Sequence, residues 1–119
     1  MNILILGSGG REHTFAYKIS ESIICNKLYV APGNAGTSNI ATNIPIAVTD
    51  FKAIKECVIK CQITMVVVGP EDPLVKGITD FFRSDSELKD VLLIGPSKAG
   101  ALLEGSKERA KEFMIDHQI

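Results

Sequence analysis

The sequence predicts an α/β domain whose helices cover both faces of a largely parallel sheet, a three-layer arrangement. Short apolar runs rich in Ile, Leu and Val alternate with longer segments in which apolar residues recur at helical spacing. Gly or Pro follows most of the short runs and ends them. This alternation is typical of βαβ units, in which parallel strands are buried between helices.

The first half of the chain contains the elements that open this pattern. Strands are predicted at residues 2–6, 27–31 and 44–48, and a helix at 11–22. Phe15, Ile19 and Ile23 recur at every fourth position, so they are expected to face the sheet. The segment 33–43 is rich in Gly, Asn, Thr and Ser and has no apolar period, so it is predicted to be a long loop.

A second helix is predicted directly after Asp50. The Asp50 side chain stands where an N-cap is expected, because its carboxylate accepts hydrogen bonds from the free amides of the next turn. One face of this helix carries apolar residues at helical spacing: Phe51, Ile54, Val58 and Cys61. The segment therefore predicts a helix that packs against the sheet.

The second half continues the alternation. Residues 63–68 contain Ile, Thr and three consecutive Val, which favours a strand buried on both faces. A helix follows, marked by Leu74, Ile78, Phe81 and Phe82. A polar connection at 84–90 leads to a buried strand at 91–94, and two helices are predicted at 98–103 and 106–117.

Composition limits the classes of function. The 119 residues carry 13 Lys and Arg against 14 Asp and Glu, and the basic residues are scattered. Neither nucleic acid nor an anionic membrane surface is therefore an expected partner. The longest apolar runs have four residues, far below the ~20 that a membrane-spanning helix needs. With no secretory signal, the sequence predicts a single cytoplasmic domain over residues 1–119.

The three cysteines do not predict a metal site. Cys57 and Cys61 stand four positions apart, which on a helix places both thiols on one face. A closed zinc site needs about four ligands, commonly in two paired clusters. The sequence has no second cluster, so Cys25, Cys57 and Cys61 are expected to be reduced thiols that pack as small apolar groups.

The loop at 7–13, Gly-Ser-Gly-Gly-Arg-Glu-His, is the first candidate ligand site. Its glycines allow an anion to approach the backbone amides at a helix N-terminus. The dinucleotide fingerprint fails, because Glu12 replaces its third glycine and Pro32 follows the second strand where an acidic residue is expected. A Rossmann-type strand, turn and helix remains. The loop either binds a phosphate or ribose phosphate, or is a structural tight turn.

The charged residues after these glycines have different explanations. Glu12 in a first helical turn is favourable to the helix dipole, which is a sufficient structural reason for it. Arg11 is unfavourable there, and a bound phosphate would explain it. His13 has no partner visible in the sequence and is predicted to be structural.

Two further loops follow strand ends. Residues 31–37, Ala-Pro-Gly-Asn-Ala-Gly-Thr, form either a surface turn or a binding loop. In the loop at 69–77, Asp72 precedes a proline and is predicted to be a helix N-cap. Glu71 has no such structural explanation, so it is the carboxylate expected to contact sugar hydroxyls or an amine.

Together, four motifs resemble the phosphoribosylamine–glycine ligase family, also called glycinamide ribonucleotide synthetase. They are the segments 7–13, 31–37, 68–77 and 103–107, in this order and spacing. Asp72 departs from the family pattern, in which many members have Ala. The departure has little consequence if Asp72 is only a cap.

The resemblance implies a Rossmann-like N-terminal domain of an ATP-grasp ligase. That ligase joins glycine to 5-phosphoribosylamine through a glycyl phosphate, with ATP and Mg²⁺ (or Mn²⁺). It implies that ATP and metal bind outside this chain, in ATP-grasp and C-terminal parts that the chain lacks, so that the isolated chain is inactive. Substrate roles carry over to matching loop positions: Gly9, Gly10, Arg11 and Glu12 near the phosphate, Gly33 and Asn34 nearby, and Glu71 toward the ribose or amine.

Two other functions remain as alternatives. One is a free-standing nucleotide or phosphosugar binding module without catalysis. The other is a small NAD-dependent protein, which Glu12 and Pro32 disfavour.

Overall fold

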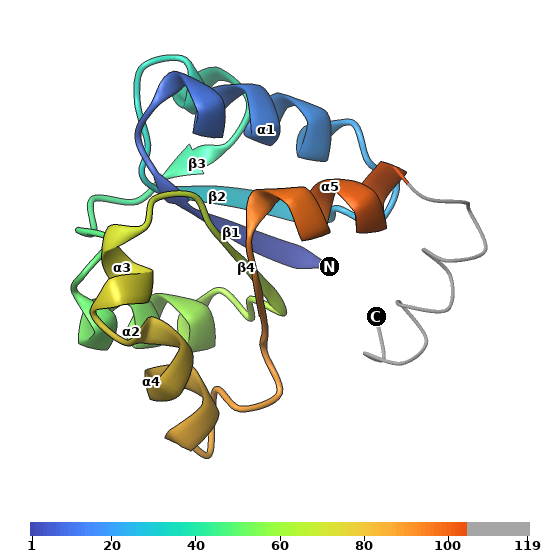
Figure 1. Cartoon of the computed structure of the whole chain (residues 1–119). Helices are drawn as coiled ribbons and strands as arrows, with labels where there is room; N and C mark the ends of the chain where they lie inside the picture. Colours follow the sequence, from blue (N-terminus) through green and yellow to red (C-terminus); the bar gives the residue numbers. More distant parts are fainter. Residues whose placement is uncertain (105–119) are drawn as a thin grey trace.

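Five parallel strands form one sheet in the computed structural model, which describes residues 1–104 (Figure 1). The strands are β1 (Asn2–Gly7), β2 (Lys27–Pro32), β3 (Thr42–Asn43), β4 (Met65–Val68) and β5 (Leu92–Ile94), in the order β3-β2-β1-β4-β5. The helices are α1 (Gly10–Ser20), α2 (Phe51–Lys60), α3 (Asp72–Val75), α4 (Ile78–Ser84) and α5 (Pro96–Glu104), with a 3₁₀ turn η1 (Thr37–Asn39). The predicted α/β class is confirmed.

Helices cover both faces of the sheet, as Figure 1 shows with α1 and α5 on one side and α2 and α4 on the other. Alternate residues of each strand face opposite layers. Ile3, Ile5, Val30, Met65 and Val67 pack in one core cluster with Ala16, Ile19 and Ala99, which come from α1 and α5. Leu4, Leu6, Val66 and Val68 pack in another with Ile54 and Phe82, which come from α2 and α4. The predicted three-layer Rossmann-like arrangement is confirmed.

The strand order creates a switch point beside β1. The chain first builds the sheet outward from β1 through β2 to β3, then returns to β4 on the other edge of β1. In such sheets the loops after the two neighbouring central strands diverge and leave a crevice at their carboxyl ends. Here that crevice lies after β1 and β4.

The predicted strand at 44–48 is wrong. The paired segment is Thr42–Asn43, opposite Tyr29 and Val30 of β2, and it falls inside the predicted loop at 33–43. Pro45 has no amide hydrogen, so a parallel ladder cannot continue through it. The Ile46 amide instead donates to the Ile44 carbonyl at 2.7 Å, and the chain turns there.

The first helix is shorter than predicted. It ends at Ser20, so helical spacing no longer applies to Ile23, whose side chain is 75% exposed. Its buried residues are Glu12, Ala16 and Ile19, while Phe15 is half-buried. The prediction that Ile23 faces the sheet is wrong, and Ile24 is buried in its place.

The helix predicted around Leu74–Phe82 is two helices. Gly77 adopts a left-handed φ of 93° between α3 and α4, a conformation that glycine tolerates well. The break separates the faces of the two helices, so Leu74 is exposed whereas Ile78 and Phe82 are buried.

The prediction for Asp72 is also wrong. Helical hydrogen bonding begins one residue earlier, because the Val75 amide donates to the Glu71 carbonyl at 2.9 Å. Glu71 therefore takes the N-cap position and Asp72 is the first helical residue. No side chain caps α3.

The other predicted elements agree with the structure, with small shifts at their ends. Asp50 caps α2, since its Oδ1 accepts from the Ala53 amide at 3.2 Å. Strand β4 is buried on both faces. Strand β5 forms as predicted, but the prediction that it is buried is wrong: its residues are half-buried, because an edge strand lacks one neighbour. Helix α5 covers the predicted helix at 98–103, whereas the helix at 106–117 lies outside the described residues.

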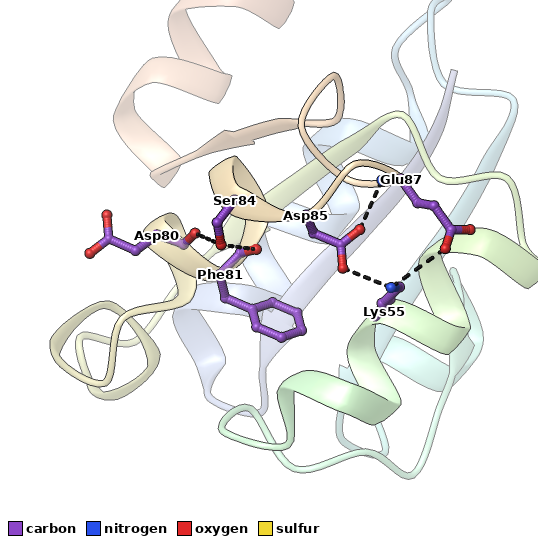
Figure 2. A network of polar contacts seen from close by, with 6 residues as sticks. All are labelled: Lys55, Asp80, Phe81, Ser84, Asp85 and Glu87. Atoms are coloured by element: carbon purple, nitrogen blue, oxygen red, sulfur yellow. Dashed lines mark hydrogen bonds and ion pairs between the residues drawn. The ribbon is translucent and has the colours of Figure 1, made fainter.

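An ion-pair network joins α2 to the connection between α4 and β5 (Figure 2). Lys55 Nζ lies 2.7 Å from Asp85 Oδ2 and 3.5 Å from Glu87 Oε1. Asp85 Oδ1 also accepts from the Glu87 amide at 2.8 Å. The hydrogen bond from Lys55 lowers the pKa of Asp85, and the same bond raises the pKa of Lys55. The network fixes the polar connection that leads into β5.

We predict that the two aspartates at the starts of α2 and α3 differ in their effect on stability. Asp50→Ala should lower the free energy of unfolding by about 1 kcal/mol, because it removes a side-chain cap. Asp72→Ala should change it by less than about 0.5 kcal/mol, because Asp72 makes no capping bond. Urea denaturation of the two variants measures both values. A larger loss for Asp72→Ala would contradict the assignment.

Candidate functional site

Three loops meet at the carboxyl ends of β1, β2 and β4. The Gly33 amide donates to the Gly7 carbonyl at 3.0 Å, which joins the loop after β2 to the end of β1. Arg11 Nη2 donates to the Gly69 carbonyl at 2.7 Å, which joins the start of α1 to the loop after β4. The structure thus brings together the loops in which the sequence placed all its candidate residues.

Asn34 holds the first two loops together through its side chain. Its Nδ2 donates to the Ser8 carbonyl at 2.9 Å and lies 3.3 Å from the Gly9 carbonyl. Its Oδ1 accepts from the Thr37 amide at 2.9 Å. The side-chain amide of Asn34 therefore orients the glycine loop, a role that the sequence alone did not show.

Thr37 and Asn43 complete this connection, and sequence reasoning did not single out either. Thr37 is fully buried. Its Oγ1 accepts a hydrogen bond from the backbone N–H of Asn34 at 2.8 Å and donates one to Asn43 Oδ1 at 2.6 Å. Asn43 Nδ2 donates to the Asn34 carbonyl at 2.7 Å. Gly33, with φ of 77°, sits so close that a Cβ there would lie 2.2 Å from Asn43 Oδ1. The sequence feature that could have indicated Thr37 and Asn43 is the polar composition of the segment 33–43.

The first turn of α1 presents free backbone amides. Gly9 is the N-cap and supplies no side-chain hydrogen bond. The amides at the start of a helix have no carbonyl partner within it, so the Gly10 end of α1 carries partial positive charge. Gly10 is exposed, and a Cβ there would meet nothing within 4 Å. An anion could therefore reach this turn.

Glu12 stands at the position of the third glycine in a dinucleotide fingerprint. Its side chain is 8% exposed and fits between glycines of two loops. A Cβ on Gly7 would lie 2.4 Å from Glu12 Oε1, one on Gly69 2.8 Å from it, and one on Gly9 3.3 Å from Oε2. Gly7 and Gly69 thus leave room for a carboxylate.

A cavity of about 280 Å³ opens at the switch point. Ile5 of β1 and Val67 of β4 line it. The rest of its lining comes from α1, the loop after β4 and the start of α5: Arg11, Glu12, Thr14, Phe15, Lys18, Gly69 and Pro96. The cavity therefore combines apolar surface with both signs of charge.

The remaining candidates lie around these loops. Glu71 is exposed, and its carboxylate makes no capping hydrogen bond to α3. Glu71 lies two residues after Gly69, whose carbonyl accepts a hydrogen bond from Arg11. His13 is exposed with its ring against the loop after β2, since a Cβ on Gly36 would lie 2.6 Å from His13 Cε1.

Within residues 1–104, no group of three or more His, Cys, Asp or Glu side chains is arranged to hold a metal ion. Cys57 is buried, and burial raises the pKa of its thiol to about 11, which favours the protonated form over the thiolate that metals bind. No helix in the described part of the chain is long and apolar enough to cross a membrane.

The fold and these loops define a Rossmann-like α/β domain with a candidate ligand site at its switch point. The family model described as "Phosphoribosylglycinamide synthetase, N domain" matches residues 1–104, and the chain belongs to this family.

Its relatives are longer proteins. A phosphoribosylamine–glycine ligase of Haemophilus influenzae is 47% identical over 121 residues, covering 100% of this chain and 27% of the relative. One of Caldanaerobacter subterraneus is 42% identical over 119 residues, covering 100% and 28%. A crystal structure of phosphoribosylamine–glycine ligase from Thermotoga maritima matches with a TM-score of 0.48 and 31% identity, covering 100% of this chain and 25% of that one. The chain thus spans about a quarter of the length of these relatives.

We predict that two glycines of the first loop respond oppositely to alanine. Gly7→Ala should lower the free energy of unfolding by about 2 kcal/mol or more, because φ is 143° and the new methyl group would overlap Glu12. Gly10→Ala should be neutral or stabilising by about 0.5 kcal/mol, because its site is open and helical. Chemical denaturation compares the two, and equal losses would contradict the role assigned to Gly7.

We also predict that Asn34→Asp destabilises the loops. The substitution keeps the shape of the side chain but replaces two donor hydrogens with an oxygen that faces carbonyl groups, at a cost of about 1–3 kcal/mol. Asn39→Asp is the matched control, since Asn39 is exposed in the same segment. Thermal unfolding should show a lower midpoint for Asn34→Asp alone, and equal midpoints would contradict the role of Asn34.

Proposed function

We propose that this chain is the N-terminal substrate-binding domain, residues 1–119, of a phosphoribosylamine–glycine ligase. The family match over residues 1–104 carries the proposal, and the names of the relatives supply the reaction. In that reaction glycine and 5-phosphoribosylamine give glycinamide ribonucleotide, while ATP gives ADP and phosphate. The step belongs to purine biosynthesis, and we place the protein in the cytoplasm.

The exposed start of α1 is the proposed phosphate site. The amides of the Gly9–Gly10 turn and the positive end of the helix favour an anion there. Arg11 adds a cation at the same turn, and a guanidinium has further N–H donors besides the one bound to the Gly69 carbonyl. A phosphate at this place explains a basic residue that the helix dipole disfavours.

The loops beside this turn hold the rest of the substrate in our proposal. Asn34 and Gly33 keep the glycine loop in position through their hydrogen bonds to Gly9, Ser8 and Gly7. Glu71 extends from the neighbouring loop with no capping bond, so its carboxylate is available for the ribose hydroxyls or the amine.

We assign ATP and Mg²⁺ (or Mn²⁺) to an ATP-grasp part outside this chain, as the resemblance to the ligase family implies and as the share of the relatives' length beyond this chain allows. There ATP would activate the glycine carboxylate as glycyl phosphate. The amine would attack that carbonyl, forming the carbon–nitrogen bond and releasing phosphate. The task left to this domain is to hold the amine-bearing substrate in position.

We predict that Glu71→Ala in the complete protein weakens the use of phosphoribosylamine. Loss of a carboxylate that binds hydroxyl or amine donors should raise KM for phosphoribosylamine about tenfold or more. KM for ATP should stay the same, because ATP binds elsewhere. Steady-state kinetics with each substrate varied in turn measures both.

Asp72→Ala is the control for this experiment, because Asp72 is an exposed carboxylate on the adjacent residue. It should leave both KM values unchanged. Unchanged kinetics for Glu71→Ala would refute its assignment. A complete protein that binds ribose phosphates but forms no glycinamide ribonucleotide would refute the ligase and support a phosphosugar-binding module.

A further inference from the structure

We infer that helix α3 docks, through Leu74 and Val75, onto an apolar surface in the part of the complete protein that lies outside this chain. The inference rests on the proposed function, because it takes this chain as one domain of a longer ligase. It adds the surface by which that domain meets the rest of the polypeptide, beside the candidate site.

Two consecutive apolar side chains of α3 face solvent in the described part of the chain. Val75 is 81% exposed and Leu74 is 47% exposed. Asp72 and Lys76, which flank this stretch, are charged and exposed. Exposed apolar surface with a polar rim is typical of a protein–protein contact. Docking would remove both apolar side chains from water, which is favourable.

The course of the backbone turns these side chains outward. Pro73 is buried and anchors α3 on the domain. Leu74, Ile78 and Phe82 recur at every fourth position, so one continuous helix would place all three on the same face. The left-handed φ of 93° at Gly77 separates α3 from α4, and Ile78 and Phe82 are buried without Leu74. The exposure of Leu74 is therefore set by the fold of this segment.

Helix α3 lies at the carboxyl end of the sheet, as does the start of α1 (Figure 1). In the connection from β4 to α3, the Gly69 carbonyl accepts the hydrogen bond from Arg11 at 2.7 Å. Glu71 is the N-cap residue of α3 and is exposed. A surface that covers α3 would therefore border Glu71. Ligand sites occur preferentially where two domains meet, and docking here would place the candidate site at such a boundary.

The length of the relatives identifies the occupant. The chain covers 27% of the Haemophilus influenzae ligase and 28% of the Caldanaerobacter subterraneus ligase, so about three-quarters of each relative lies outside the matched part. In a complete protein of this length, the remaining polypeptide is tethered to this domain. Tethering gives it a higher effective concentration near α3 than a separate molecule has. We therefore assign α3 to a surface of the same polypeptide and not to a second copy.

The test measures whether position 75 is covered in the complete protein. Val75→Cys would be treated with a maleimide, and mass spectrometry would follow the peptide that contains position 75, so that labelling of the native cysteines is counted separately. Ile23→Cys is the matched control, because Ile23 is also β-branched and is 75% exposed beyond the end of α1. Each labelling rate is compared with the rate for the same variant unfolded in urea.

We expect labelling at position 75 to be about tenfold or more slower in the folded protein than in urea, because the reagent must wait for the covering surface to open. Labelling at position 23 should stay close to its rate in urea. The protection at position 75 should not change with protein concentration, because the covering surface belongs to the same polypeptide. A photoreactive benzophenone amino acid in place of Val75 should cross-link to a residue beyond position 119.

Three results would overturn the inference. One is labelling at position 75 as fast as in urea, which would show that α3 stays in solvent. Another is protection that disappears on dilution, which would show that a second copy covers α3. The third is a cross-link to residues within 1–119 alone, which would place the occupant inside this chain. None of these measurements needs catalysis, so a complete protein that forms no glycinamide ribonucleotide would refute the proposed function and still show whether α3 is covered.

Discussion

Strand β1 is paired on both edges and packed on both faces, and the position of the other elements depends on it. Its residues Ile3 to Leu6 are at most 1% exposed. Parallel pairing sets Leu6 opposite Ala31 of β2 and opposite Val68 of β4. Because all three strands run the same way and end at nearly the same level, their loops emerge side by side. A shift in either register would separate them.

The glycines at this edge serve two different purposes. Gly9 and Gly10 leave the first turn of α1 open to an anion, and Gly10 has free space around its Cα. Gly7 and Gly69 instead make room for Glu12. A glycine-rich loop is therefore not by itself a phosphate site, because part of its glycine content is required by an acidic side chain of the same domain.

The sequence predicted most of the fold because apolar periodicity reports burial. It failed where one residue overrode the pattern. Pro45 ended a ladder that the apolar residues around it suggested, and Gly77 divided one predicted helix. Ile23 lies beyond the end of α1, where its spacing from Ile19 has no structural meaning.

The site was predictable in place but not in detail. Parallel strands deliver their loops to one edge, so the sequence order of strands and loops was enough to group the loops holding Arg11, Asn34 and Glu71. The roles of Asn34 and Glu12 depend on distances between loops far apart in the chain. The contact of Glu12 with Gly69 spans the switch point and has no local signature. The same holds for the hydrogen bonds from Asn34 to the first loop.

The first turn of α1 differs from that of a dinucleotide site in the residue at the position of the third glycine. In a dinucleotide site the third glycine lets helix and strand pack closely, and the whole turn faces a pyrophosphate. Here Glu12 stands at that position, and its carboxylate lies against Gly7 and Gly69 beside a cavity that Arg11 and Lys18 also line. The buried acidic side chain at this position therefore separates this turn from the dinucleotide fingerprint, which has its third glycine there.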